Sequence, residues 1–481
     1  MRLLVQLTPI AACLGSLATA QRLEPQTDTW NSIFSLTDSQ ISSANLSETV
    51  ANNVNIALRF EQTNWATGSV FKDPFYTDLP ANASSAPAGS ILKIESFTNT
   101  SLYTIAPTLA LSRIIYQSKT LNGSLVPVSA FVLWPYYPKD GAEAAPLVSW
   151  AHGTSGIFAE CGPSHVRNLL YQFAGPYELA LAGYAVVATD YAGLGVPYNA
   201  EGEPIVHQWA ASPAAGNDAL YAAQAAHAAF PDKTTPEFVI MGHSQGGGAT
   251  WAAAQTQLEA KVPGYLGAIA VSPVTSVIGL FEDAGTSLAL IQAWKSLTYA
   301  LPELKISEML TPRGYELAKL TEELQTCNAA LSTLLYGAIS LAPTEPLTID
   351  AWFDSHWAKE WDEITVAGGK DFAGPMLVLQ GGGDAATKEP RVTHYVDLTC
   401  ERFPEKEITY VVAEGVTHIP TMYATQQFWL GWLDQRFKDT KDRSTGKCTK
   451  KTIGAKTPMP FEQYQPDTNW YMSYVLSSYQ L

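Results

Sequence analysis

The pentapeptide Gly242-His243-Ser244-Gln245-Gly246 constrains the fold of this chain more than any other feature. It directly follows the apolar run Phe238–Met241, which has the length and composition of a buried strand. Ala249–Ala260, just beyond it, is expected to be a helix. A strand that turns into a helix over so few residues needs glycines, because side chains would clash in the tight turn. The chain therefore predicts a strand–turn–helix unit near its centre.

Short apolar strands alternate with helical stretches on both sides of this unit. Such alternation is typical of an α/β fold, a mostly parallel sheet covered by helices on both faces. Hydrophobic residues make up 46% of the chain, enough to fill the large core that such a sheet needs. The other expected strands are Ser129–Trp134, Leu147–Ala151, Tyr184–Thr189, Tyr265–Val271, Met376–Gln380 and Ile408–Val412, and the other expected helices are Ala214–Phe230 and Thr421–Phe437.

The alternation stops in residues 273–374. Apolar residues there recur at helical spacing, as at Leu288, Ile291 and Trp294, and no clear strand is present. We interpret this segment as a helical cap inserted before the next strand; a block of ordinary flanking helices is the alternative. The expected division is a signal peptide (1–20), an N-terminal extension that wraps the core (21–90), a first core part (91–272), the cap (273–374), a second core part (375–440) and a C-terminal tail (441–481).

The N-terminus has the features of a secretory signal peptide. Arg2 supplies a positive charge, Leu3–Leu17 is mostly apolar, and Ala18-Thr19-Ala20 is a small-residue cleavage site. No later stretch offers about 18 consecutive apolar residues, so we expect a secreted protein without a membrane span. Four Asn-x-Ser/Thr sequons are candidate surface glycosylation sites in such a protein: Asn45, Asn82, Asn99 and Asn122.

The remaining cysteines and the net charge indicate which covalent links, cofactors and binding partners to expect. Four cysteines remain after removal of the signal peptide: Cys161, Cys327, Cys400 and Cys448. In an oxidising compartment they are expected to form disulfides, and three pairings are possible. No Cys-x-x-Cys or His-Glu-x-x-His pattern occurs, so we expect neither a metal nor another cofactor. A net charge of −16 argues against nucleic acid and anionic membranes as partners. We expect a monomer that makes at most transient contact with a lipid interface.

Ser244 is the candidate nucleophile, because the turn would lift its hydroxyl out of the carboxyl edge of the sheet. A serine needs a base, and on this kind of fold the order is serine, acid, histidine. His418 follows the strand Ile408–Val412 by a short turn. Asp384 follows Met376–Gln380 and three glycines, so it could orient the imidazole. The weaker candidates are His356 and His394 for the base, and Asp371 and Asp397 for the acid.

Two backbone N–H groups are candidates for an oxyanion hole, which acyl transfer also needs. One belongs to Gln245, directly after the nucleophile. The other belongs to Thr154, in the loop Ala151-His152-Gly153-Thr154-Ser155-Gly156 that follows the strand Leu147–Ala151. His152 is interpreted as a structural hydrogen-bonding residue.

With these motifs the chain resembles the fungal secretory lipase family, the Candida lipase A-like α/β-hydrolases. The resemblance covers about residues 90–440 and rests on the loop 151–156 leading to Cys161-Gly162-Pro163-Ser164, on Thr189-Asp190-Tyr191-Ala192-Gly193-Leu194-Gly195, and on the Ser244 pentapeptide, with Asp384 and His418 at similar separations. It implies a secreted ester hydrolase with a helical cap, a C-terminal flap and the disulfides Cys161–Cys327 and Cys400–Cys448. The sequence Ala385-Ala386-Thr387-Lys388 after the acid departs from many relatives.

The substrate expected from the sequence is a lipid or another apolar acyl ester, as in a triacylglycerol lipase. The reason is the cap, whose apolar residues could shelter an acyl chain. A small-acyl esterase that deacetylates a secondary metabolite, an acyltransferase and a catalytically silent binding module are the alternatives. The cap residues concerned are Leu288, Ile291, Trp294, Leu331, Leu334, Leu335, Tyr336 and Ile339.

Overall fold

The computed structural model describes residues 33–284, 286–342, 344–438, 447–454 and 457–466. The expected signal peptide lies outside the described residues. All four sequon asparagines are exposed. No helix among the described residues has the length and apolar character needed to cross a bilayer.

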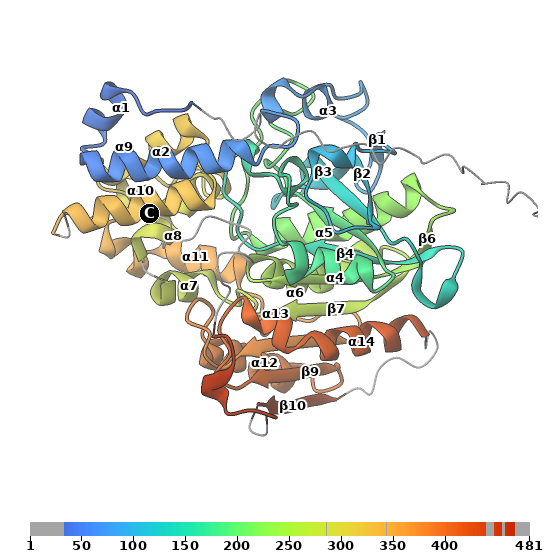
Figure 1. Cartoon of the computed structure of the whole chain (residues 1–481). Coiled ribbons are helices and arrows are strands. Elements are labelled where there is room, and N and C mark those ends of the chain that lie inside the picture. Colours follow the sequence, from blue (N-terminus) through green and yellow to red (C-terminus); the bar gives the residue numbers. More distant parts are fainter. Residues whose placement is uncertain (1–32, 285, 343, 439–446, 455–456, 467–481) are drawn as a thin grey trace, which may run out of the picture.

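A twisted sheet forms the centre of the molecule, with the strand order β1-β2-β3-β5-β4-β6-β7-β8-β9-β10 (Figure 1). The pairs from β5 through β4 to β10 are parallel, whereas β1, β2, β3 and β5 pair antiparallel. The mostly parallel sheet that the sequence predicts is thus confirmed. The strands are β1 Ile91–Glu95, β2 Ala110–Lys119, β3 Leu125–Trp134, β4 Ala145–Ala151, β5 Ala185–Thr189, β6 Thr234–His243, β7 Tyr265–Val271, β8 Met376–Gly381, β9 Ile408–Ala413 and β10 Cys448–Ile453.

Alternating side chains of the strands enter two separate cores, one on each face of the sheet. Leu147 and Ile240 pack with helices α5 (Ser212–Ala229) and α6 (Gln245–Ala260). Their neighbours Val148 and Met241 face the opposite core. That core is covered by α4 (Pro176–Leu181) and α14 (Gln426–Lys438), while α12 (Glu389–Arg402) packs beside α6. Helices on both faces bury the parallel strands β4, β5 and β8 along their whole length.

Residues 273–374, which we call the cap, are helical and lie on one side of the sheet (Figure 1). Helix α2 of the N-terminal extension packs lengthwise on α10, so close that a Cβ at Gly337 would lie 2.7 Å from Val50. The extension therefore supports the cap. The cap helices are α7 Val277–Ala284, α8 Thr286–Ala300, α9 Pro312–Leu324, α10 Asn328–Leu341 and α11 His356–Thr365, and the extension contributes α1 Asp38–Ser43, α2 Glu48–Thr63 and α3 Pro74–Thr77.

Two disulfides join segments that are distant in the sequence. Cys161–Cys327 connects the loop after β4 to the start of α10, and Cys400–Cys448 connects α12 to β10. Both are the pairs that the resemblance implies. Strand β10 belongs to the tail beyond residue 440, so part of that tail extends the sheet by pairing parallel with β9.

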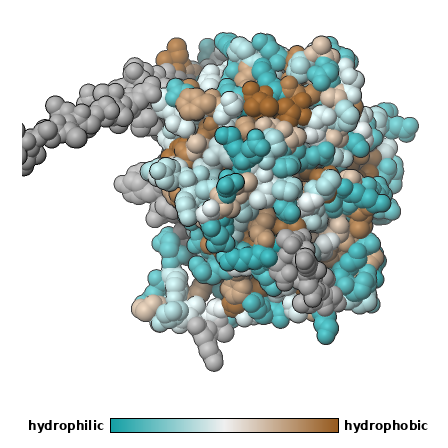
Figure 2. Space-filling model, turned by 90° about the vertical axis from the view of Figure 1, so that its right-hand side faces the viewer, coloured by the Kyte–Doolittle hydropathy of each residue, from teal (hydrophilic) through white to brown (hydrophobic). Residues whose placement is uncertain are grey.

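The surface on the side of strands β1 to β3 is mixed in polarity. Figure 2 shows hydrophobic residues reaching this surface in separate groups among hydrophilic ones. Scattered exposed apolar residues of this kind are normal for a folded chain. The described part of the chain contains no cluster of three or more His, Cys, Asp or Glu side chains that could hold a metal ion.

Candidate active site

Ser244 lies between β6 and α6 in a strained turn, with φ +61° and ψ −120°. A strained conformation of this kind persists only where the surrounding structure fixes it. A Cβ at Gly246 would lie 1.9 Å from the carbonyl oxygen of Ala151, and one at Gly242 would lie 2.3 Å from that of Gly246. The two glycines of the pentapeptide are therefore required by space. The N–H of Ser244 donates to Val271 at 3.0 Å, which anchors the turn to β7.

His418 and Asp384 face each other from the loops after β9 and β8. Nδ1 of His418 donates to Oδ2 of Asp384 at 2.7 Å. The other oxygen, Oδ1, accepts from the backbone N–H groups of Ala386 and Thr387, both at 2.9 Å. Burial alone would raise the pKa of Asp384, but the hydrogen bond and positive charge of His418, together with Thr387, hold that pKa well below its usual range. The carboxylate is ionised and fixed in direction.

His243 connects the Ser244 turn to the loop of His418. The rings of His243 and His418 have centroids 4.5 Å apart, and Nε2 of His243 donates to the carbonyl oxygen of His418 at 3.1 Å. Its Nδ1 accepts from the hydroxyl of Tyr171 at 2.8 Å. Burial and the neighbouring His418 lower the pKa of His243, so it stays neutral. This role of His243 was not predicted from the sequence, where its one signal is its position directly before Ser244.

The weaker candidates lie elsewhere. His356 is exposed in the cap and His394 is exposed on α12. Asp371 pairs with Lys406, and Asp397 pairs with Lys450. None of these side chains contacts the Asp384–His418 pair among the described residues.

Thr154 and Gln245 lie side by side beyond Ser244. The hydroxyl of Thr154 donates to Oε1 of Gln245 at 3.1 Å. Neither backbone N–H has a hydrogen-bond partner within the described ranges, so both donors are available. The loop of Thr154 is tied to the cap, because the N–H of Asn328 donates to Ser155 at 2.9 Å and the disulfide of Cys161 lies beside it.

A cavity of about 240 Å³ lies over Ser244. Side chains of the cap form one wall and the loops of the core form the other, and the lining is mixed in polarity. Both candidate oxyanion donors line it. The lining residues are Thr154, Trp209, Ala210, Ser212, Ser244, Gln245, Val274, Leu280, Ala289, Gln292, Asn328 and Ser332.

This cavity is not lined by the following cap residues, which were predicted to shelter an acyl chain: Ile291, Trp294, Leu331, Leu334, Leu335, Tyr336 and Ile339. Ile291, Leu331, Leu334 and Leu335 are fully buried inside the cap and its contact with the core. Tyr336 is 55% exposed. The cap residues that do line the cavity are the polar Gln292 (α8), Asn328 and Ser332 (α10) and the apolar Val274, Leu280 (α7) and Ala289 (α8).

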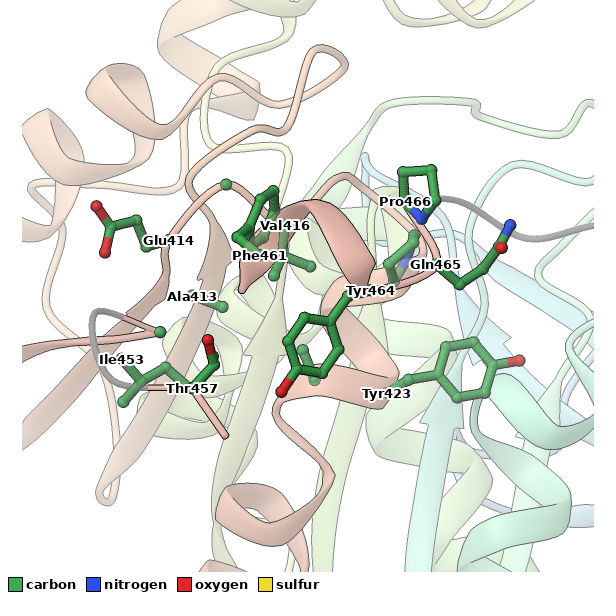
Figure 3. Close-up of a pocket in the computed structure, with 14 residues that line it drawn as sticks. Ala413, Glu414, Val416, Tyr423, Ile453, Thr457, Phe461, Tyr464, Gln465 and Pro466 are labelled. Atoms are coloured by element: carbon green, nitrogen blue, oxygen red, sulfur yellow. The ribbon is translucent and has the colours of Figure 1, made fainter. Parts of the chain in front are cut away.

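A larger, apolar pocket of about 580 Å³ lies on the other side of the His418 loop (Figure 3). Val416 of that loop, Tyr423 of α13 (Pro420–Ala424), and Phe461 and Tyr464 of the C-terminal segment surround it. Neither Ser244 nor Asp384 lines it. The cavity that contains Ser244, although smaller, is therefore the candidate site.

Comparisons with known proteins agree with this architecture. Residues 150–428 match the model of the alpha/beta hydrolase family. The structure resembles Candida antarctica lipase A in its closed state, with a TM-score of 0.62, 17% identity, and coverage of 82% of this chain and 92% of that one. It also resembles the rice cell wall degrading esterase LipA from Xanthomonas oryzae, with a TM-score of 0.57, 15% identity, and coverage of 74% and 100%. No curated protein matches the chain in sequence. At these identities the two structures show a shared fold.

Proposed function

The chain belongs to the alpha/beta hydrolase family, and from this premise we propose that it is a secreted carboxylic ester hydrolase with Ser244, His418 and Asp384 as its catalytic triad. The observation that carries the proposal is the 2.7 Å hydrogen bond between His418 and Asp384, together with the strained turn of Ser244. The predicted signal peptide and two disulfides support secretion.

The proposed reaction proceeds through an acyl-enzyme. The hydroxyl oxygen of Ser244 attacks the ester carbonyl carbon while His418 takes the hydroxyl proton, and Asp384 stabilises the imidazolium. The backbone N–H groups of Thr154 and Gln245 hold the oxyanion of the tetrahedral intermediate. His418 then gives its proton to the departing alcohol. Water, deprotonated by His418, releases the carboxylic acid and restores Ser244.

Short acyl groups fit the proposed site better than long ones. The cavity of about 240 Å³ is smaller than the roughly 300–1,000 Å³ of sites that hold drug-sized ligands. Its cap wall mixes the apolar Val274, Leu280 and Ala289 with the polar Gln292, Asn328 and Ser332, and a long aliphatic chain would bury these polar groups away from water. This proposal therefore differs from the long-chain substrate expected from the sequence.

A long-chain ester, as in a lipase, is the second candidate. The observation in its favour is the apolar pocket of about 580 Å³ next to the His418 loop. Burial of each methylene there would contribute about 0.8 kcal/mol.

A series of p-nitrophenyl esters from acetate to palmitate, with a triglyceride emulsion as a further substrate, separates the two. We expect kcat/KM to be highest for acetate to butyrate, with no emulsion activity. A steady rise to palmitate with emulsion turnover would overturn the short-acyl proposal in favour of the lipase. Adding a competing alcohol tests the acyltransferase alternative, because transesterified product in excess of acid would make the alcohol the natural acceptor.

A further inference from the structure

Four side chains form a continuous hydrogen-bonded row behind the candidate oxyanion hole. Nε1 of Trp209 donates to Oγ1 of Thr154 at 3.0 Å, and Oγ1 of Thr154 donates to Oε1 of Gln245 at 3.1 Å. Nε2 of Gln245 lies 3.3 Å from Nε2 of His207. Nδ1 of His207 lies 3.0 Å from the carbonyl oxygen of Ala192. Both residues with candidate oxyanion donors stand in the middle of this row.

The donor and acceptor at every step are fixed by chemistry. A carbonyl oxygen only accepts, so Nδ1 of His207 carries a proton toward Ala192. Burial lowers the pKa of His207 to about 3, so the ring is neutral and its Nε2 accepts. Gln245 must then turn its NH2 group to His207 and its oxygen to Thr154. The Thr154 hydroxyl must donate to that oxygen, and the indole N–H of Trp209, which only donates, supplies its other bond.

The two ends of the row are held in place by the fold. His207 and Trp209 are 4% and 3% exposed. A Cβ at Gly193 would lie 2.4 Å from the backbone nitrogen of His207, so only glycine lets that loop come so close. The Trp209 ring stacks on Phe281 of α7, with centroids 6.4 Å apart and planes within 7°. Both ends of the row thus lie in the loop between β5 and α5, and the Trp209 end also contacts the cap.

We infer that His207 and Trp209 are positioning residues that lock Thr154 and Gln245, and thereby the two backbone N–H groups, in the geometry that receives the oxyanion. This inference rests on the proposed function. Thr154 lies in a loop that has no helix or strand, and the hydrogen bonds of the row hold this residue by its side chain. The hydroxyl of Thr154 already donates its proton to Gln245. The backbone N–H is therefore the group with which Thr154 can donate a hydrogen bond to a substrate.

An oxyanion hole must be rigid before the reaction to be effective, since it then needs no reorganisation as charge develops. Losing the row should therefore affect the transition state more than substrate binding. The expected signature is a fall in kcat with little change in KM, and an equal loss of affinity for a tetrahedral mimic such as a boronic acid.

The test uses the full mature protein and p-nitrophenyl acetate. Trp209→Phe keeps the ring on Phe281 but removes the N–H, and Thr154→Val keeps the shape but removes the hydroxyl. We expect each to lower kcat about 10- to 100-fold, less than or similar to the loss of a whole oxyanion donor. Thr154→Ser, which keeps the hydroxyl, should recover most of the loss.

Trp352→Phe is the matched control. Trp352 also neighbours Phe281, with centroids 6.4 Å apart, and its Nε1 has no hydrogen-bond partner among the described residues. Its removal should leave kcat and boronate affinity unchanged. The inference is overturned if Trp209→Phe and Thr154→Val match this control, or if they raise KM or lower thermal stability without changing kcat and boronate affinity. A wild-type protein without esterase activity would overturn the proposed function, and this inference with it.

Discussion

Nδ1 of His418 donates a hydrogen bond of 2.7 Å to Oδ2 of Asp384, although the two residues are carried by separate loops. Asp384 is held from behind by Ala386, Thr387 and Gln380, so the carboxylate cannot turn away from the ring. Fixing Nδ1 as the protonated nitrogen leaves Nε2 of His418 as the basic one. This is the arrangement that a serine nucleophile requires of its base.

Asp384→Asn should lower kcat about 10³- to 10⁴-fold with little change in KM, because the amide no longer stabilises the imidazolium and can favour the wrong tautomer. Steady-state kinetics with a short acyl ester measures the effect. Asp397→Asn, whose carboxylate pairs with Lys450 on the surface, is the control and should change kcat less than twofold, a bound we take from the small effects of surface substitutions. Equal effects of the two variants would remove Asp384 from the proposed triad.

Gly246→Ala should destabilise the protein by at least about 3 kcal/mol, since a Cβ there would lie 1.9 Å from the backbone of Ala151 and force the turn of Ser244 apart. Gly431→Ala, inside α14 with open space around it, should instead stabilise by up to about 1 kcal/mol. Denaturant unfolding compares them. A stable, active Gly246→Ala variant would contradict the tight packing described for the turn.

Glu61→Gln should lower stability in a way that depends on pH. Glu61 accepts from the N–H groups of Cys327 and Ala330 at the start of α10. Burial raises the pKa of Glu61 to about 7, because its effect is larger than that of the hydrogen bonds, which lower the pKa. A raised pKa means that the contribution of Glu61 to stability is fully present below its unfolded pKa of 4.5 and is lost as the pH rises through about 7.

The melting temperatures of wild type and Glu61→Gln should therefore differ more at pH 5 than at pH 8, with a loss of about 2 kcal/mol at pH 5 for the weakened, partly buried hydrogen bonds. The exposed Glu48 on the same helix gives the control variant Glu48→Gln, which should change stability by less than about 0.5 kcal/mol. A difference that grows toward pH 8 would show that Glu61 acts as a buried anion and not as a proton-binding group.

Removing the disulfide Cys161–Cys327 by serine substitution should reduce both stability and activity, whereas removing Cys400–Cys448 should reduce stability alone. Each loss is expected to cost about 2–5 kcal/mol, and the first about 1 kcal/mol more, because it closes a chain separation of 166 residues against 48. Only the first lies beside the contact between Asn328 and the loop of Thr154, which is the proposed oxyanion loop. Thermal unfolding and kcat are the measurements; loss of activity only in the Cys400–Cys448 variant would contradict this assignment.

Much of the site could be predicted because parallel strands bring their carboxyl ends to one edge. Asp384 and His418 each follow a recognisable apolar strand, and these strands, β8 and β9, are neighbours in the sheet, so the contact of the two side chains follows from strand order alone. The row of Trp209 and His207 had no such signal. It depends on side chains 38 to 55 residues from their partners in sequence, which meet only because a loop folds back over Gly193.

The cap and the sheet edges were harder to predict for different reasons. The apolar spacing at Ile291, Leu331 and Leu334 correctly indicated helices, but helical periodicity does not say whether an apolar face meets another helix or a substrate. Strand β10 (Cys448–Ile453) was missed because it is a polar, mostly exposed edge strand without alternation.

The most direct test of the central claim is fluorophosphonate labelling of wild type and Ser244→Ala, followed by peptide mass spectrometry and an esterase assay. We predict labelling of the wild type at Ser244 alone, and at least a 10³-fold loss of kcat in Ser244→Ala with unchanged folding. The Ser244 side chain is only partly buried, so its truncation to alanine should leave the fold intact. Retained hydrolysis by Ser244→Ala, or a label on another serine, would contradict the proposed mechanism.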